Sequence, residues 1–416
     1  MTQASHALQL TRRHLLLGAA SLGAGGLLAA CGGGGGDGAM PSGGTASATS
    51  FASGPITGFG SIIVGGVRFD ESAARVEGDD GQTRRRDELK LGAVVEIEGG
   101  RLDRALGLCT AMRVVLGHSL LGPRTDAAGA GATSFVLLGQ TVVVTSSTIF
   151  DTSVPGGSLD GIAQGDIVEA HALYDPVARQ FLATRLEVKT GVTEYGLRGP
   201  ISSLDTTART FMLGTERIFY GSAVPAVQAS ALFEGAFVRV HLQTTMDPTL
   251  DAWVATRLRV GLRSLPLRND AEAEVEGVIT SFTSPQSFVL NGLPVDASAA
   301  TFPDGTSGVV AGARVEVSGT IVNGVLVATR VELEDGPHMG GGMGGRMPFE
   351  FHGTISGLDT TDNTFVLRGM TIWYGGAVAY SHGSEADLAN GRRVEVKGVI
   401  APDRTRIEAR RIDFES

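Results

Sequence analysis

The stretch Val309–Leu333 recurs in outline along the chain, and this recurrence constrains the fold more than any other feature. Within it, Val315 and Val317 alternate with polar residues, which is the period of a strand with one buried face and one wet face. Asn323-Gly324 supplies the positive backbone angles that a tight hairpin turn requires, and the chain then returns as the partner strand. The stretch is therefore predicted to be an antiparallel hairpin.

A glycine followed by an alternating strand opens such a hairpin five times, at spacings of 70 to 79 residues. The five glycines are Gly92, Gly165, Gly235, Gly312 and Gly391. The returning strand repeats as well, in near copies that begin at Ala183, Ala255 and Ala328 and in looser ones over Thr110–Val114 and Glu408–Ile412. A period of this size indicates one module written in tandem rather than one large domain.

Each module also opens alike, most visibly in Ile201–Leu213 and Ile355–Leu367. We expect a first strand at a Gly-x-Ile pattern, a second at Phe-Val-Leu, a third near Val295 or Ile372, a variable loop, and the final hairpin. Five short strands in roughly 70 residues bury little as a flat sheet, and closing them into a barrel removes the exposed edges. The sequence predicts an all-β tandem array of about five small OB-like five-stranded barrels, with a small sandwich as the alternative.

The predicted organisation accounts for nearly all of the chain of 416 residues. The modules are expected at residues 54–117, 118–190, 194–262, 272–335 and 349–416, with a Gly/Met-rich linker at 336–348. Residues 1–31 are expected to be a signal peptide that ends in a lipidated cysteine, and 32–53 a disordered tether, since its Gly, Ser, Ala and Thr cannot bury enough apolar surface to order. Aromatic residues make up only 6% of the chain, so each barrel should gain stability from packing against its neighbours.

The N-terminus carries an export pattern. Arg12 and Arg13 precede an uncharged run, Leu15–Ala30, that is too short and too rich in glycine for a membrane span. Because small residues lead directly into Cys31, the segment resembles a bacterial lipoprotein signal, in which the cysteine thiol takes a diacylglycerol; an ordinary secretory peptide is the alternative. The arginine pair also resembles a twin-arginine export signal, and the choice between that route and Sec export stays open.

Lipid on Cys31 would make the membrane the first partner of this protein. The next residue is Gly32 rather than Asp, which by resemblance to enteric lipoproteins favours the outer membrane, with the protein facing the periplasm. Cys109 then has no disulfide partner and is expected to be a small buried residue. Removal of the signal takes away Arg12 and Arg13 and moves the formal charge from -10 to -12, so the mature chain has no electrostatic reason to bind nucleic acid.

No sequence motif for catalysis occurs in the chain. Gly-x-Ser-x-Gly, Ser-x-x-Lys and His-Glu-x-x-His are all missing, and the eight histidines are scattered. His171 lies on a strand pattern and is interpreted as decorating a sheet, and carboxylates such as Glu316 and Glu395 recur with the repeat and are interpreted as structural. The sequence therefore predicts a protein that is not an enzyme and needs no cofactor.

The linker between the last two modules departs from the repeat. It holds His338, Met339, Met343 and Met347, so three thioethers follow one another at a spacing of four. Thioether sulfur is a soft ligand that suits Cu(I), so a periplasmic copper-binding protein is the alternative function. The simpler interpretation is a Gly-rich linker in which the methionines are incidental.

Taken together, the patterns Gly-x-Ile, Phe-x-Leu-x-Gly, Gly-x-x-Val-x-Val and Ala-x-x-Ile resemble a bacterial family of tandem modules called domain of unknown function 5666. The resemblance covers about Gly54–Phe414, fits least well at Gly122-Pro123-Arg124, and implies an envelope lipoprotein without implying an activity. We therefore expect a non-catalytic cell-envelope lipoprotein that acts as a scaffold or binds a polysaccharide or another envelope protein. Its oligomeric state stays open.

Overall fold

The computed structural model describes residues 50–415, apart from 104–106, 118–119, 128, 130, 224–231, 262–263, 334–348 and 403–404. The described residues form β-strands and short 3-10 turns, which confirms the all-β prediction. None of the helical turns in this part of the chain has the length and apolar character needed to cross a membrane.

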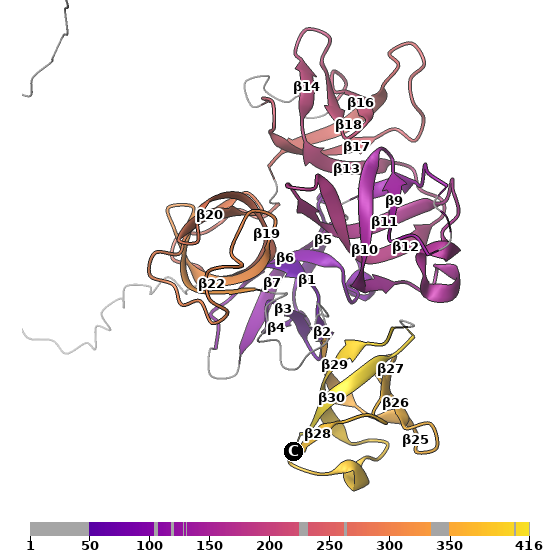
Figure 1. Ribbon diagram of the computed structural model, residues 1–416, viewed down its shortest axis with the longest axis vertical. Helices are drawn as coiled ribbons and strands as arrows, with labels where there is room; N and C mark the ends of the chain where they lie inside the picture. The colour runs from indigo at the N-terminus through magenta and orange to yellow at the C-terminus, as the bar shows by residue number, and fades with distance from the viewer. Residues whose placement is uncertain are drawn as a thin grey trace, which may run out of the picture. The chain divides into compact units, whose positions relative to one another are not determined.

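The fourth module shows the strand order most completely. Its strands are β19 (Glu272–Ser284), β20 (Ser287–Leu290), β21 (Leu293–Asp296), β22 (Arg314–Val322) and β23 (Val325–Leu333). β20 pairs antiparallel with β19 and β21, β21 pairs parallel with β23, and β22 pairs antiparallel with β23 and β19. The ladder thus returns to its first strand and closes a barrel, seen as the orange ring in Figure 1. This closed order is that of an OB-like barrel and not of a sandwich.

The other modules follow the same strand order, and in three of them the first strand is broken in two. The first module consists of β1 (Ser50–Pro55), β2 (Gly58–Phe59), β3 (Ile62–Val64), β4 (Val67–Asp70), β5 (Arg75–Gly78), β6 (Val94–Gly99) and β7 (Leu108–Leu116). The second consists of β8 (Leu120–Pro123), β9 (Ser134–Leu137), β10 (Gln140–Phe150), β11 (Ile167–Asp175) and β12 (Gln180–Lys189). In both, a parallel pair joins the third strand to the last, as β4–β7 and β10–β12.

The third and fifth modules repeat this plan. The third consists of β13 (Tyr195–Pro200), β14 (Ser202–Asp205), β15 (Thr210–Leu213), β16 (Glu216–Phe219), β17 (Phe237–Leu242) and β18 (Trp253–Val260). The fifth consists of β24 (Phe349–Thr354), β25 (Ser356–Asp359), β26 (Thr364–Leu367), β27 (Met370–Trp373), β28 (Ala379–Ser381), β29 (Arg393–Ile400) and β30 (Ile407–Phe414). Their parallel pairs are β16–β18 and β27–β30.

The repeated glycine fixes the fourth barrel strand to the first. In the fourth module, Gly312 N–H donates to Ile279 O at 2.9 Å, and Ile279 N–H donates to Ala313 O at 2.9 Å. The same pair of bonds joins Gly92 to Ile56, Gly165 to Arg124, Gly235 to Ile201 and Gly391 to Ile355. All five glycines have φ between +80° and +92°, a backbone conformation that glycine adopts without a Cβ penalty.

The Ala-x-Arg part of the repeat encodes a β-bulge. In β12, Ala183 pairs with Ala172 and Arg185 with His171, so Thr184 has no residue opposite it. The same position is skipped at Met112, Thr256, Thr329 and Arg410. A bulge bends a strand and increases its twist, which a small barrel needs in order to close. The alanine that precedes the skipped residue is buried in every module, as Ala111, Ala183, Ala255, Ala328 and Ala409.

The first strand begins at Ser50, earlier than predicted, which corrects the last four residues of the segment 32–53 that was expected to be a disordered tether; residues 32–49 lie outside the described residues. Ser50–Ser53 pairs antiparallel with β6 on one edge and parallel with β19 on the other, and it buries Phe51 and Ala52. The segment holds a single large apolar side chain, so its own pattern does not indicate a strand. Two neighbouring strands, one of them in the fourth module, order it instead.

The apolar cores follow the modules only in part. The second and third modules share one cluster, and the first, fourth and fifth each centre on a separate one. Phe51 and Val115 of the first module join the cluster of the fourth, and Leu91 and Ile149 join that of the fifth. Cys109 lies in the core of the first module with 1% of its surface exposed, which confirms its prediction as a small buried residue. The shared core agrees with the expectation that neighbouring barrels stabilise one another.

We predict that Gly391→Ala destabilises the fifth module by about 1–2 kcal/mol, the cost of a left-handed backbone for a residue with a Cβ. The added methyl group would meet no atom within 4 Å, so the loss would come from the backbone alone. Hydrogen exchange of the amides in β24–β30, measured on the full chain, reports this loss of stability. The control is Gly129→Ala in the second module, where an added methyl group also meets no atom within 4 Å and φ is not positive. It should change the free energy of unfolding of its own module by less than about 0.5 kcal/mol. An equal effect of both changes would contradict the assigned role of Gly391.

Candidate functional site

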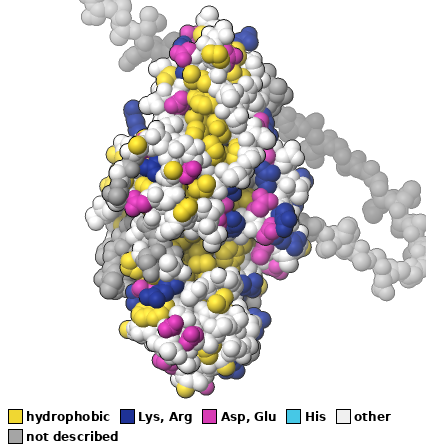
Figure 2. Space-filling view, turned by 90° about the vertical axis from the view of Figure 1, so that its right-hand side faces the viewer, with side chains coloured by type: hydrophobic (Ala, Val, Ile, Leu, Met, Phe, Trp, Pro, Cys, Tyr) yellow, Lys and Arg dark blue, Asp and Glu magenta, His cyan; other side chains and the backbone are white. Residues whose placement is uncertain are grey.

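Charged side chains of the described modules are gathered into mixed clusters. Figure 2 shows positive and negative side chains next to one another on one face rather than separated by sign. Two clusters and one cavity bring together polar residues from different modules. We describe them in turn because each is a place where binding or chemistry could occur.

The first cluster joins the first and second modules. Arg185 and Glu187 of β12 contact each other at 2.5 Å, and Arg185 also pairs with Asp151. Lys90 of the first module lies 3.3 Å from Asp151 and 3.2 Å from Glu187. Lys189 adds a contact of 2.7 Å to Glu187. Burial alone would raise the pKa of Glu187, but the cations of Arg185 and Lys189 outweigh it and lower this pKa from 4.5 to about 2.

Backbone contacts from the same strands complete this junction. Thr184 Oγ1 donates to Gly92 O at 2.6 Å, and Arg185 Nη1 donates to Leu91 O at 3.1 Å. Val94 N–H donates to the Nδ1 of His171 at 3.3 Å, and His171 is only 3% exposed. His171 was interpreted from the sequence as decorating a sheet, and the structure places it in the contact between two modules. These groups are engaged with one another, so the cluster is suited to holding modules together.

The second cluster surrounds His352 on β24. Its Nε2 lies 2.7 Å from Glu350 Oε1 and its Nδ1 lies 2.7 Å from Glu415 Oε1. Burial lowers the pKa of His352, but hydrogen bonds to these two carboxylates outweigh burial and raise it. Lys397 contacts Glu350 at 3.0 Å and Glu395 at 3.2 Å. Among the described residues, Glu350, His352 and Glu395 form the group whose ligand atoms lie close enough to hold a metal ion, within 4.8 Å of one another.

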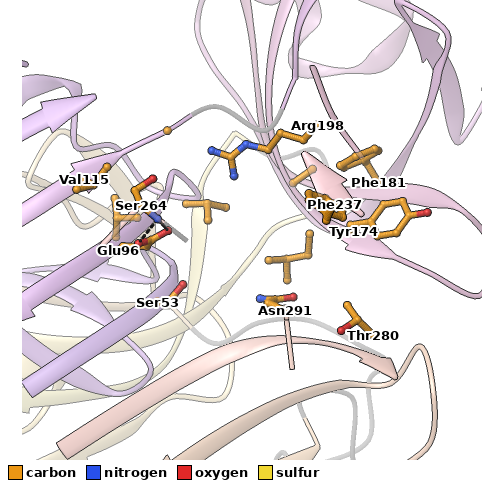
Figure 3. Close-up of a pocket in the computed structure, with 15 residues that line it drawn as sticks. Ser53, Glu96, Val115, Tyr174, Phe181, Arg198, Phe237, Ser264, Thr280 and Asn291 are labelled. Carbon is orange, nitrogen blue, oxygen red and sulfur yellow. Dashed lines mark hydrogen bonds between the residues drawn. The ribbon is translucent and has the colours of Figure 1, made fainter. Parts of the chain in front are cut away.

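A cavity of about 70 Å³ lies where residues of the first four modules meet (Figure 3). Its aromatic side is built by Tyr174, whose ring centroid lies 5.1 Å from that of Phe181 and 5.4 Å from that of Phe237. Figure 3 shows these three rings together, with Asn291 and Thr280 of the fourth module beside them. The cavity therefore combines an apolar wall with hydrogen-bonding groups.

The opposite side of the cavity is polar. The Glu96 carboxylate accepts the backbone N–H of Ser264 at 2.8 Å and that of Leu265 at 2.7 Å. Burial raises the pKa of Glu96. Arg198 donates from Nη2 to Asp79 at 3.0 Å, while its buried Nε–H has no hydrogen-bond acceptor among the described residues. Arg198 Nε–H is thus an unsatisfied buried donor on the polar side of the cavity.

A larger hollow of about 570 Å³ adjoins this cavity. It shares Phe237, Ser264 and Asn291 with the cavity and continues along Pro266 and Leu267 of the connection before the fourth module. The small cavity and the hollow together offer a surface along which an extended ligand can lie. Sequence patterns do not show this site, because its lining residues come from several modules, and repeat positions such as Val95 and Glu96 face it only in the first module.

The predicted site residues fall outside the described residues. These are the export arginines Arg12 and Arg13, the lipidation site Cys31, and the copper ligands His338, Met339, Met343 and Met347. Lipidation and copper binding therefore stay predictions from sequence. The structure does describe Glu395, which the repeat pattern assigned to a structural role, and places it in the His352 cluster.

Comparison with known proteins identifies the module. Residues 126–187, 276–332 and 352–413 match the family model described as Domain of unknown function (DUF5666), and these segments lie in the second, fourth and fifth modules. No curated protein matches the chain. Among solved structures, "drosophila Unr CSD456" is 14% identical, with 55% of this chain and 98% of that chain covered and a TM-score of 0.14, a value too low to support an argument.

We predict that acid weakens the junction of the first two modules as the pH falls from about 4.5 to about 2. The folded-state pKa of Glu187 is the lower one, so its contribution is fully present above the unfolded value of 4.5 and is lost as the pH falls through about 2. This contribution is on the order of 3 kcal/mol. Hydrogen exchange of β6 and β12, corrected for intrinsic rates, should show the loss of protection.

In the Glu187→Gln variant, the amides of β6 and β12 should already be less protected from exchange at pH 7. Their protection should then change little as the pH falls from about 4.5 to about 2. The matched control is Glu332→Gln, which removes a carboxylate paired with Arg330 in the fourth module. In this control variant, the protection of β6 and β12 should depend on pH as it does in the unaltered protein. A wild-type junction whose protection is constant down to pH 2 would contradict the assigned role of Glu187.

Proposed function

Three modules of this chain belong to the DUF5666 family, which makes it a tandem-repeat protein of that family, and we propose that it is a non-catalytic scaffold of the bacterial cell envelope that binds a polysaccharide. Repeated β-barrel modules fit a scaffold or binding role. The observation that carries the finer proposal is the cavity at the junction of four modules, with its aromatic wall and its free Arg198 donor.

The chemistry of the cavity suits a sugar ring. A sugar presents C–H groups on its ring faces and hydroxyl groups around its rim. The Tyr174 and Phe237 rings offer an apolar surface for the C–H groups. The Asn291 amide and the Thr280 hydroxyl already form hydrogen bonds within the fourth module. Each still has a lone pair, and Asn291 has a second amide N–H, so together with Arg198 Nε–H they supply polar groups for the hydroxyls.

The charged groups and the size of the cavity narrow the class of sugar that it can bind. The Glu96 carboxyl group lines the polar side, and the charge of Arg198 is already paired with Asp79 behind it, so the cavity offers no unpaired cation to an anionic sugar and a neutral sugar is the better match. An enclosed water needs roughly 10–15 Å³ of cavity volume. The cavity volume of about 70 Å³ is therefore enough for one edge of a sugar unit. The adjoining hollow of about 570 Å³ has room for further units of the chain.

Location in the envelope rests on the sequence before the first strand. Cys31 follows a small-residue site, and the tether 32–49 would separate a lipid from β1. The negative net charge and the mixed charges in Figure 2 support a partner that is not a nucleic acid. Copper binding by Met339, Met343 and Met347 is the alternative, and it rests on their spacing alone.

We predict that neutral oligosaccharides bind at the cavity. Saturation-transfer NMR with maltotetraose, cellotetraose and tetra-N-acetylglucosamine tests binding to the full chain. Tyr174→Ala should weaken binding at least tenfold because it removes the aromatic wall. Arg198→Lys should weaken it several-fold, since lysine keeps the charge beside Asp79 and lacks the Nε donor.

The matched control is Phe233→Ala, which removes an aromatic side chain that is 61% exposed and does not line the cavity. Its affinity should be unchanged. No binding to any of the three probes, or equal binding by the Tyr174 and Phe233 variants, would contradict the proposal.

We also predict that Cys31→Ser prevents lipid attachment. Cells fed radiolabelled palmitate should label the unaltered protein and not the variant, and the variant should move from the membrane fraction to the soluble one. Cys109→Ser serves as the control, because that thiol is buried in the first barrel. Label retained by the Cys31 variant would overturn the assigned anchor.

A further inference from the structure

The His352 cluster lies on one face of one strand pair. β24 and β29 pair antiparallel, with His352 opposite Glu395 and Glu350 opposite Lys397. Residues two apart on a strand point to the same face, so all four side chains share it. The backbone ladder thus places three candidate ligands, one imidazole and two carboxylates, side by side within a single module.

A positive charge already occupies the centre of this group. The Lys397 ammonium lies 3.0 Å from Glu350 Oε2 and 3.2 Å from Glu395 Oε1. Its side chain is 48% exposed, so it can move into solvent without breaking a packed core. The two carboxylates are therefore arranged to stabilise a cation that can be exchanged.

The histidine is held from behind by a further carboxylate. Glu415 Oε1 lies 2.7 Å from Nδ1 of His352, which leaves Nε2 directed at the group that contains Glu350. A carboxylate that binds the far nitrogen of a metal-ligating histidine fixes the orientation of the ring and increases its basicity. The guanidinium of Arg68, from the first module, opposes a cation here, because its Nη1 lies 3.3 Å from Nδ1 and 3.5 Å from Nε2 of His352. Zinc binding at Nε2 therefore requires Arg68 to move away from the ring as well.

We propose that His352, Glu350 and Glu395 form a zinc site in the fifth module. One imidazole nitrogen and two carboxylate oxygens are a ligand set that zinc accepts, with water in the fourth position. Zn²⁺ would take the place of the Lys397 ammonium, and the proton on Nε2 of His352 would pass to solvent. This inference is independent of sugar binding, and its nitrogen and oxygen ligands differ from the thioethers of the predicted copper site.

Zinc binding by the metal-free full chain tests the proposal, with Zn²⁺ titrated against a chromophoric chelator. One equivalent should bind. His352→Gln and Glu395→Gln should each raise the Kd at least tenfold. Lys397→Met should lower the Kd several-fold because it removes the competing ammonium, and a folding defect cannot produce such a gain.

Two controls separate this site from other ligands. His382→Gln removes an exposed histidine that contacts Asp413 at 2.6 Å in the same module, and it should leave the Kd unchanged. The triple change of Met339, Met343 and Met347 to Ser should leave it unchanged as well. The proposal is overturned if no equivalent binds, if Lys397→Met fails to tighten binding, or if His382→Gln weakens it as much as His352→Gln.

Discussion

The structure depends on a pair of hydrogen bonds between a glycine and the bend of the first barrel strand. The glycine donates to a carbonyl on that strand, and the same first-strand residue donates back to the carbonyl of the next residue. Only a backbone with positive φ presents both groups in this way, and all five repeats place glycine there. The bulge at Ala-x-Arg then bends the last strand so that the sheet can close. Because these two features are local, each module can form its barrel while its other positions vary.

Most of the barrel could be predicted from sequence for this reason. The glycine, the alternating strand and the Ala-x-Arg segment lie close together in the chain and recur, so pattern and period show them directly. The contacts between modules could not be predicted, because the same Ala-x-Arg motif contacts different partners in different modules. Arg185 reaches the backbone of the first module, whereas Arg257 pairs with Glu194 and Arg330 with Glu332. The early start of strand β1 at Ser50 was missed on the same grounds, since β19 of a distant module supplies one of its edges.

The two proposed sites use the array differently. The sugar site draws its walls from several modules, so it exists only when the barrels are packed together. The zinc site lies on one strand pair of one barrel and needs no neighbour for its three ligands. Arg124 shows how a repeat position can also be reused within a module. It stands where the four other modules have isoleucine, keeps the paired backbone bonds, and extends its guanidinium over Phe135.

Hydrogen exchange at the five repeated glycines tests the central claim most directly. In a sample labelled with ¹⁵N-glycine, the amides of Gly92, Gly165, Gly235, Gly312 and Gly391 should exchange as slowly as amides in the middle of neighbouring strands, because each donates to a first-strand carbonyl. Gly324, which lies at a hairpin turn, provides the fast reference in the same spectrum. Exchange of the five glycines at the rate of Gly324 would contradict the account, since the barrels would then lack the bonds that close them.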